Sequence, residues 1–455
     1  MPAARKSPRR RRSPSTSPTR KRSTPKKSPR RRRSQSKSPT RKRSPSTKKS
    51  PRAIRQEYRT SIRKSKKAFR DYLKSTYDLK PGSALVQACT LSAIPPYGSF
   101  HVGVVQGPSG SGKSTTLAKF TPAMRVIKMR ADMPLMDQLG STPQEAEAML
   151  FAVALNNIPD WMQPFQRLST GQKFRAELAM TLSKRKPHHF LVMDEFGSML
   201  DENTAQAISH RLQKFARREN ISVVLATNRR SLSTFLRPEW VLDTQACTFT
   251  VQPYRNWPQP KLKLIFQFVD SKDERSELWE MFRRYHYLDH ALVGHAKVFR
   301  VTCNGQLCAL QASKRHFNPS NMVHAHRTVV LPQFQGLGIG TVIHDTIGAY
   351  VASLTRWSKE GKDGSVKWHK KRGEFSVVPS HTKLAAAHAK DKANWQTKYM
   401  NTQHNPNEKV FKKEDRKMNA FHYHGPPLKG TFANVYDKHA KTPQQLSFSR
   451  TISVR

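Results

Sequence analysis

Acidic residues and cysteines are both scarce in this sequence of 455 residues. Asp and Glu total 31 against 82 Lys and Arg, so the formal net charge at pH 7 is +51, and no acidic residue precedes Glu57. A chain this basic attracts polyanions, and we expect nucleic acid as a partner, DNA before RNA. The four cysteines show no Cys-x₂-Cys spacing. That pattern argues against a structural zinc site and is typical of reduced thiols in a cytosolic or nuclear protein.

Long apolar runs are also missing. No stretch of about 18 uncharged apolar residues occurs, and the first residues are charged. We therefore expect neither a membrane span nor a secretory signal peptide. The expected location is the nucleus or nucleic acid itself, as in a virion core, and otherwise the cytoplasm.

Residues 1–52 form a low-complexity tail. Residues 7–13, Ser-Pro-Arg-Arg-Arg-Arg-Ser, recur at 28–34, and residues 17–23 recur at 38–44, both with an offset of 21 residues. With almost no apolar residues, the tail cannot offset the entropy lost on ordering, so we expect it to be disordered when free. It resembles the Ser-Pro-Arg/Lys arms of linker histones, protamines and some viral core proteins, which implies phosphate contacts without base readout. A nuclear-localisation or solubilising tail is the alternative.

Residues 53–75 remain basic but change their pattern. Ile54, Tyr58 and Ile62 recur every four residues, and Phe69 continues the apolar spacing. This pattern predicts a basic amphipathic linker helix over 53–75, whose apolar stripe docks on the domain that follows.

A glycine-rich loop at residues 107–114, Gly-Pro-Ser-Gly-Ser-Gly-Lys-Ser, fits the pattern G-x-x-x-x-G-K-[ST] at every fixed position. An apolar strand-like run precedes it at 101–105, and a helix-compatible run follows at 114–120. Glycines let successive N–H groups turn around a β-phosphate, Lys113 would reach the β and γ oxygens, and Ser114 would bind Mg²⁺. The loop therefore predicts a nucleotide site.

Three further motifs follow the loop in a set order. Residues 168–172 read Leu-Ser-Thr-Gly-Gln, an apolar run at 190–193 ends in Asp194 and Glu195, and residues 198–201 read Ser-Met-Leu-Asp. In this order and spacing, the first domain, residues 76–256, resembles an ABC-type ATPase, with these motifs as signature loop, second nucleotide motif and D-loop. The resemblance implies ATP and Mg²⁺ as cofactors. It also implies a head-to-tail homodimer, because the signature loop of one subunit faces the nucleotide of the other.

The resemblance also implies a role for single residues. Asp194 would hold Mg²⁺ through water, and Glu195 would orient or deprotonate the attacking water. The implied nucleotide-binding positions are Gly107, Ser109, Gly110, Gly112, Lys113, Ser114, Thr115, Ser169, Gly171, Gln172 and Asp201. The implied catalytic positions are Glu195, Lys113, Gln138 and Asn228, and the implied metal ligands are Ser114 and Asp194.

Two positions depart from the family pattern. The strand-like run at 221–226 is followed by Thr227 and Asn228, where the family carries a switch histidine. An amide cannot take up a charge, so we expect slow hydrolysis. Gln138 is the best match to the Q-loop glutamine, although it lies unusually close to Lys113 in the sequence.

A proline-rich bridge at 253–260 precedes a second domain, residues 257–438, which is followed by a C-terminal extension, residues 439–455. The patterns predict strands at 261–269, 297–302, 306–312 and 326–331, and helices at 274–285 and 341–354. Asn304-Gly305 between two of the strands is a type I′ hairpin signal.

Residues 335–340, Gln-Gly-Leu-Gly-Ile-Gly, fit Q/R-x-x-G-x-G/A, the acyl-CoA loop of GNAT acyltransferases. In that family, consecutive N–H groups at a helix N-terminus bind the CoA pyrophosphate. The resemblance implies that an acyl-CoA binds at Gln335, Gly336, Gly338 and Gly340, and acetyl-CoA is the acyl-CoA that we expect. A dinucleotide-binding turn is the alternative, but here a hairpin precedes the turn, as in GNAT folds.

Both domains together resemble proteins described as ABC-type ATPases fused to a predicted acetyltransferase domain akin to phage DNA-modification enzymes. His286, Tyr287 and Asp289 are candidates for proton transfer, each with a role in packing or hydrogen bonding as the alternative. Residues 359–372 form a basic stretch with Trp368, which suits either nucleic acid or a solvated loop.

The sequence therefore predicts an α/β P-loop ABC-type ATPase domain followed by an α+β GNAT-like domain, in which an ATPase dimer controls an acyl-CoA-dependent transferase on or near nucleic acid. One alternative is a nucleic-acid-organising or virion core ATPase whose second domain only binds. Another is a protein or small-molecule acetyltransferase.

Overall fold

The computed structural model describes residues 50–59, 66–77, 85–124, 126–286, 291–316, 321–378, 382–401, 417–440 and 446–454. Residues 1–49 of the expected tail are not among the described residues, so the disorder of the tail and its nucleic-acid contacts stay predictions. The chain from Lys49 onward forms one compact unit. Arg52 already belongs to this unit, because its N–H donates to Ser92 Oγ at 3.1 Å and its carbonyl accepts from the Ser92 N–H at 2.9 Å. The tail therefore ends before residue 52.

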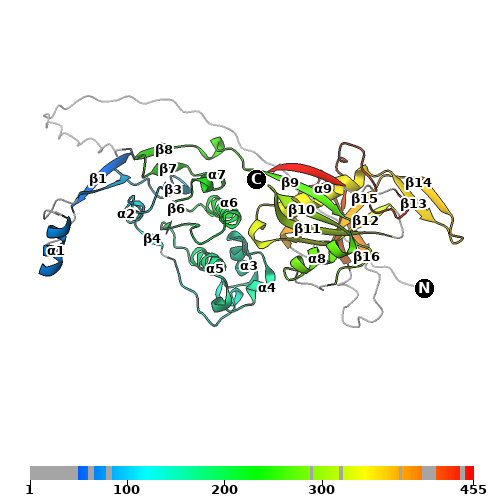
Figure 1. Ribbon diagram of the computed structural model, residues 1–455, viewed down its shortest axis with the longest axis horizontal. Coiled ribbons are helices and arrows are strands. Elements are labelled where there is room, and N and C mark those ends of the chain that lie inside the picture. Colours follow the sequence, from blue (N-terminus) through cyan, green and yellow to red (C-terminus); the bar gives the residue numbers. More distant parts are fainter. Residues whose placement is uncertain are drawn as a thin grey trace, which may run out of the picture. The chain divides into compact units, whose positions relative to one another are not determined.

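The first half of the compact unit is built on a mainly parallel sheet with the strand order β4-β5-β6-β3-β7-β8 (Figure 1). Its strands are β3 (Val102–Gln106), β4 (Ala123–Met124), β5 (Phe190–Met193), β6 (Val223–Thr227), β7 (Trp240–Asp243) and β8 (Thr248–Val251). Its helices are α2 (Lys113–Leu117), α3 (Pro143–Ala152), α4 (Ile158–Trp161), α5 (Thr170–Ser183), α6 (Glu202–Arg218) and α7 (Ser233–Leu236). Only β8 runs antiparallel to its neighbour among the described strands of this sheet.

The central strands of this sheet are buried on both faces. Val104 of β3 packs in the same core cluster as Ile208 of α6. The next residue, Val105, belongs to a second cluster with Leu117 of α2 and Phe120. Successive side chains of a strand point to opposite faces, so helices cover both sides, as is usual for parallel sheets. The loops at the carboxyl ends of β3, β5 and β6 are therefore held on a rigid support.

The prediction of a linker helix over residues 53–75 is wrong for residues 53–59, which form a strand. Strand β1 (Ala53–Arg59) pairs antiparallel with β2 (Leu85–Leu91), and helix α1 occupies only Lys67–Tyr77. Pairing with a distant strand overrides a local helical spacing, because strand formation depends on tertiary context. None of the described α1 side chains is buried, and Phe69 is 62% exposed. The expected docking of the apolar stripe is therefore not seen.

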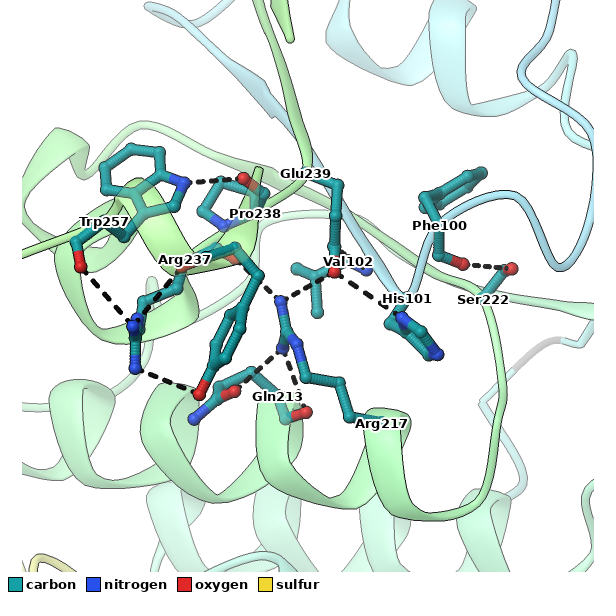
Figure 2. A network of polar contacts seen from close by, with 11 residues as sticks. Phe100, His101, Val102, Gln213, Arg217, Ser222, Arg237, Pro238, Glu239 and Trp257 are labelled. Atoms are coloured by element: carbon teal, nitrogen blue, oxygen red, sulfur yellow. Dashed lines mark hydrogen bonds and ion pairs between the residues drawn. The ribbon is translucent and has the colours of Figure 1, made fainter. Parts of the chain in front are cut away.

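The C-terminal end of α6 joins a polar network that ties the first sheet to the proline-rich bridge (Figure 2). Arg217 donates to Glu239 Oε1 at 2.9 Å and to the carbonyl of Arg237 at 2.8 Å. Glu239 also accepts from the N–H of Val102, at 2.9 Å. The guanidinium groups of Arg217 and Arg237 both contact the ring of Tyr254 as cation–π pairs, at 3.9 and 4.0 Å from the ring centroid. The bridge is thus anchored to α6 and to the start of β3.

Glu239→Ala is expected to lower the free energy of unfolding by about 2–4 kcal/mol, because it removes the carboxylate partner of the half-buried Arg217 guanidinium and leaves the N–H of Val102 without its acceptor. The side chains of Arg217 and Glu239 are only 16% and 20% exposed, so water screens the pair weakly. Glu219→Ala is the matched control. Its carboxylate pairs with Arg185 and the exposed Arg218, and its loss is expected to change stability by about 1 kcal/mol or less. Urea unfolding of both variants measures the difference, and equal losses would contradict a structural role for the network.

The second half carries a larger sheet, in which eight described strands follow the order β16-β17-β15-β12-β11-β10-β9-β18. These strands are β9 (Lys261–Val269), β10 (Lys297–Cys303), β11 (Gln306–Arg315), β12 (Met322–Val330), β15 (Glu374–Val377), β16 (Trp395–Asn401), β17 (Lys417–Tyr423) and β18 (Ser447–Ser453). The helices are α8 (Lys272–Arg283), α9 (Ile339–Ser353) and α10 (Thr382–Lys390), with a short 3₁₀ turn, η6 (Pro332–Phe334), before α9.

Several predicted elements of this half are confirmed. Strand β9 has the predicted bounds, and Asn304 and Gly305 have φ angles of +49° and +87°, as a type I′ turn requires. Two predictions are corrected. The basic stretch at 359–372 is a hairpin of β13 (Arg356–Glu360) and β14 (Val366–Lys370). The C-terminal extension is part of the fold, because β18 pairs with β9 along the sheet edge.

Candidate functional site

The glycine-rich loop connects β3 to α2, as the motif predicts. Gly107, Gly110 and Gly112 have φ angles of +154°, +75° and +93°, which side-chain-bearing residues rarely adopt. At Gly107 a Cβ atom would also lie 2.1 Å from Thr244 Oγ1. Lys113 begins α2 and donates from Nζ to the carbonyl of Pro108 at 2.7 Å, which holds its side chain back along the loop.

Ser114 and Asp194 meet across the end of the sheet. The hydroxyl of Ser114 donates a hydrogen bond to Asp194 Oδ2, although the two residues lie 80 positions apart. A hydroxyl and a carboxylate oxygen are ligands that suit Mg²⁺, which otherwise keeps waters and substrate phosphates. Among the described residues no group of three or more His, Cys, Asp or Glu side chains could hold a metal. By their donor chemistry, Ser114 and Asp194 fit the protein ligands of a Mg²⁺ ion.

Glu195 lies in the turn that follows β5. Its φ angle is +51°, in the left-handed region that glutamate rarely adopts. The N–H of Glu195 donates to Asp194 Oδ1 at 2.9 Å, and the N–H of Phe196 donates to the carbonyl of Ala226 at 2.8 Å. Such strain persists where the surrounding structure holds it. The turn keeps both carboxylates exposed at the edge of the sheet where the phosphate loop begins.

The signature motif forms the start of α5. Ser169 is the N-cap: its Oγ accepts from the N–H of Gln172, and Gln172 Oε1 accepts from the N–H of Ser169, a capping box. A Cβ atom on Gly171 would lie 3.1 Å from the side chain of Leu200, so the glycine allows the signature loop to touch the D-loop. Asp201 caps the next helix, α6, by accepting from Thr204 N–H at 2.9 Å.

Gln138 and Asn228 have different surroundings. The amide of Gln138 is engaged by its own loop: Oε1 accepts from the N–H of Arg130 at 2.8 Å, and Nε2 donates to the carbonyls of Arg130 and Met133 at 3.1 and 3.0 Å. Asn228 is exposed directly after β6. The carbonyl before it, that of Thr227, accepts from the N–H of Gly107 at 3.3 Å. The structure thus brings Asn228 to the phosphate loop, whereas Gln138 stabilises the 130–138 turn.

Two residues at this site were missed by the sequence analysis. Thr244 Oγ1 lies 2.6 Å from Ser111 Oγ and donates to the carbonyl of Gln106 at 3.0 Å, which braces the phosphate loop from β7. Arg229 donates to the carbonyl of Leu200 at 2.8 Å and so fixes the D-loop. Neither has a local sequence signal, because each is recruited from a distant strand end.

The predicted acyl-CoA loop borders a cavity of about 1190 Å³. Strands β12 and β15 pair in parallel only from Met322 to His324. Beyond that point the cavity is lined by residues 325–330 on one strand and by Val377 and Val378 on the other. The strands therefore stop pairing where the cavity lies, which leaves a slot open to a ligand.

Gln335, Gly336, Gly338 and Gly340 all line this cavity. Gln335 Nε2 donates to the carbonyl of Val330 at 2.8 Å, which ties the turn to the end of β12. Gly336 and Gly338 have φ angles of +91° and +83°. Helix α9 begins directly after Gly338, so its first N–H groups lie beside the cavity.

His326 is a further cavity residue, and it sits at a β-bulge. Across β11 and β12, Ala312 pairs with Arg327 and Ser313 pairs with Ala325, so His326 has no partner in the ladder. Bulges of this kind re-aim a side chain. Burial, aided by the nearby Arg327, lowers the pKa of His326 to about 4, so its imidazole is neutral at pH 7. His286 also lines the cavity, whereas Tyr287 and Asp289 lie outside the described residues.

The sequence matches no family model, and no curated protein is significantly similar to it. Solved structures of ABC proteins are similar to part of it. A dimeric bacterial ABC transporter cassette shares 19% identity over 36% of this chain and 89% of its own, with a TM-score of 0.28. An ABC transporter cassette in its ADP conformation shares 14% over 35% and 79%, with a TM-score of 0.26. A bacterial Atm1-family exporter with ATP bound shares 18% over 36% and 33%, with a TM-score of 0.27.

At these identities and TM-scores, no function passes from those proteins to this chain. The candidate site is defined by its own residues: a glycine-rich loop at 107–114, the hydroxyl–carboxylate pair of Ser114 and Asp194, and the capped N-terminus of α5. None of the described helices is both long and apolar enough to cross a bilayer.

Proposed function

We propose that the first half binds and hydrolyses ATP as an ABC-type ATPase. The observation that carries this proposal is the contact between Ser114 of the phosphate loop and Asp194 at the end of β5. It supports the proposal because a hydroxyl of the glycine-rich loop and a carboxylate at a strand end are the protein groups that an ATPase site of this type uses to hold Mg²⁺. Lys113 holds the β- and γ-phosphates, and Glu195 acts on the attacking water.

The partner of this site is a second copy of the chain. The signature helix start and the D-loop present exposed residues, among them Ser169, Ser198 and Met199, which is 64% exposed. In a head-to-tail homodimer this face meets the nucleotide of the other subunit. Purified protein tests the proposal: magnesium-dependent ATP hydrolysis, and gel filtration that shifts from monomer to dimer when ATP is added, support it. A chain that binds no nucleotide overturns it.

We propose an acyl-CoA-dependent transferase as the second activity of the chain. The favouring observation is the slot where β12 and β15 stop pairing, because the glycine turn of α9 lies at the same cavity. A pantetheine arm carries amide groups that can pair with an unpaired strand, and a pyrophosphate suits N–H groups at a helix start. His326, whose imidazole is neutral at pH 7 and whose Nε2 accepts from the N–H of Val293 at 3.4 Å, lines this cavity together with His286, and these two histidines are our candidates for the group that accepts a proton from an attacking amine.

The acceptor of this transferase is proposed to be nucleic acid or a molecule bound to it. Hairpin β13–β14 supports this, because its strand β14 is exposed along its whole length and carries Lys367 and Lys370. Trp368 on the same strand is 37% exposed and stacks under the guanidinium of Arg356 at 4.5 Å. Cations beside a stackable ring suit single-stranded nucleic acid. Incubation with labelled acetyl-CoA and either nucleic acid or protein tests the acceptor. Label on the nucleic acid supports this proposal, whereas label on protein or on a small molecule indicates a different acceptor. Acyl-CoA binding without any transfer indicates a domain that only binds.

Gly338→Val is expected to weaken acyl-CoA binding at least about 100-fold, since a side chain would block access of the pyrophosphate to the N–H groups of the turn. A Cβ atom at Gly338 meets no protein atom within 4 Å, so it would enter open space. Gly305→Val is the matched control. It has a similar φ angle, +87° against +83°, and equally open surroundings, but lies in a hairpin turn away from the cavity. Calorimetric titration measures both, and unchanged binding in Gly338→Val would remove the acyl-CoA assignment.

A further inference from the structure

A chain of hydrogen-bonded side chains runs from the cavity into the core of the second half. Thr328 of β12 lines the cavity and is partly exposed. Its Oγ1 lies 3.0 Å from Nε2 of His344 on α9, and Nδ1 of His344 lies 2.9 Å from Nε2 of His388 on α10. Both histidines are buried. The chain therefore links the hydroxyl at the cavity wall to groups that water does not reach.

Both histidines of this chain are neutral at pH 7. Burial, aided by the neighbouring His388, lowers the pKa of His344 to about 3, and burial lowers the pKa of His388 to about 4 against the opposing effect of Asp391. A neutral imidazole carries one N–H and one bare nitrogen. Because the two rings share a hydrogen bond, only two arrangements exist: both rings carry their hydrogen on Nδ1, or both carry it on Nε2.

The inner end of the chain distinguishes these arrangements. Nδ1 of His388 is buried and has no hydrogen-bond partner among the described residues. The rings of Trp395 and Phe421 pack around the imidazole, with centroids 4.1 and 5.6 Å from its own. A hydrogen on this nitrogen would be a buried N–H without an acceptor, and such groups are rarer in proteins than buried acceptors without a donor. Both rings are therefore assigned their hydrogen on Nε2.

This arrangement makes Thr328 a hydrogen-bond donor toward the cavity. The Nε2–H of His344 donates to Thr328 Oγ1, so the hydroxyl hydrogen of Thr328 has to point to a different acceptor. No residue in the described part of the chain supplies one. Since Thr328 lines the cavity, its hydroxyl hydrogen is available to a ligand there.

We propose that Thr328 donates a hydrogen bond to the acyl carbonyl oxygen of the bound acyl-CoA, and that His344 and His388 are positioning residues that keep it a donor. This inference rests on the proposed acyl-CoA function. Thr328 lies two residues after His326, a candidate acceptor of the amine proton, and both residues line the cavity. The donor and the proton acceptor thus come from one strand.

The hydrogen bond acts while negative charge is on the carbonyl oxygen. The amine nitrogen attacks the carbonyl carbon and forms the C–N bond, and the C=O π electrons move to the oxygen. When they return, the C–S bond breaks and the thiolate leaves. The amine proton, taken up by His326 or His286, ends on the sulfur. A donor that is already oriented stabilises the oxyanion, and loss of one such donor lowers turnover by about 10²–10³-fold.

Thr328→Val tests the contact, because it removes the hydroxyl and keeps the branched shape. Thr302→Val is the matched control, since Thr302 is a partly exposed strand threonine of the same sheet that does not line the cavity. Calorimetry on the full-length variants measures the binding of CoA, which has no acyl carbonyl and should bind Thr328→Val as tightly as it binds the parent. Infrared spectra of bound acetyl-CoA with ¹³C at its carbonyl report the contact.

Thr328→Val is expected to shift the carbonyl stretch of bound acetyl-CoA to higher wavenumber and to lower turnover by about 10²–10³-fold. Turnover is measured as release of the CoA thiol in the presence of nucleic acid or protein. Thr328→Ser, which restores a hydroxyl, and Thr302→Val should keep the parent carbonyl stretch. Turnover of Thr302→Val should equal that of the parent.

His388→Leu and His388→Gln test the positioning role. Leucine cannot donate to Nδ1 of His344, so Thr328 is free to donate to His344 instead of the ligand, and the carbonyl stretch should move toward that of Thr328→Val. Glutamine carries an amide N–H that can donate to His344 and should restore the parent stretch. The ¹⁵N chemical shifts of the two rings report directly whether Nε2 carries the hydrogen.

The outcomes separate this inference from the function on which it rests. If the parent protein binds neither CoA nor acetyl-CoA, both fall. If it binds acetyl-CoA and Thr328→Val leaves the carbonyl stretch or the turnover unchanged, the catalytic contact of Thr328 is overturned while the acyl-CoA function stands. Equal weakening of CoA and acetyl-CoA binding in Thr328→Val also overturns it, because the hydroxyl then contacts another part of the ligand. Hydrogens on Nδ1 overturn the positioning role, and the ¹⁵N spectrum decides it alone if unfolding midpoints show that His388→Leu does not fold.

Discussion

Glu195→Gln is expected to retain ATP while its turnover falls about 10²–10⁴-fold, the range for loss of a positioned general base. The amide keeps the shape of the side chain in the turn after β5, where the φ angle of +51° and the bond from the Glu195 N–H to Asp194 involve only the backbone of residue 195. The change therefore removes the carboxylate charge to which the proposed function assigns the attacking water, and it leaves the loop geometry in place. Phosphate release under single-turnover conditions measures the effect.

Lys113→Ala supplies the contrast to Glu195→Gln. It removes the cation to which the proposed function assigns the β- and γ-phosphates, so nucleotide binding itself is expected to be lost. Glu195→Gln should form a stable dimer with ATP on gel filtration, since the nucleotide stays trapped, whereas Lys113→Ala should remain monomeric. Hydrolysis at the parent rate in both variants would contradict the ATPase assignment.

Deletion of residues 1–48 is expected to remove most of the salt dependence of nucleic-acid binding. If the tail contacts roughly 6–10 phosphates, the intact chain should lose about 10³–10⁵-fold in affinity between 50 and 200 mM salt, with little dependence on sequence. The deletion ends at residue 48, because the compact unit begins at Lys49 and Arg52 is bonded to Ser92. Fluorescence titration with DNA and RNA of several sequences measures the slope.

The control for the tail deletion is a variant in the folded part. Lys367→Ala with Lys370→Ala removes two charges from β14 without touching the tail. It should reduce the salt slope by only about 2. A shortened chain that keeps the full slope would place the nucleic-acid site in the compact unit instead.

Local sequence determined those structural features that depend only on residues within one short segment of the chain. The phosphate loop, the signature helix capped by Ser169 and the hairpin at Asn304-Gly305 need particular residues at fixed spacing, because φ angles and caps are set by immediate neighbours. Buried strands such as β5 and β9 were recognisable for the same reason: their apolar pattern matches a period of two or a continuous run.

The strands and side-chain contacts that depend on pairing between distant segments were decided only by the tertiary structure. Residues 53–59 form a strand because β2 is available to them, and the C-terminal residues join the second sheet because β9 has a free edge. The contact of Ser114 with Asp194, the brace from Thr244 and the placement of Arg211 on the glycine turn span distances in sequence that no local pattern encodes. Side chains far apart in the chain meet only after burial has stacked the elements that carry them. The sequence by itself predicted a phosphate-binding glycine turn in each half, and packing decided that helix α6 of the first half lines the cavity beside the second of these turns.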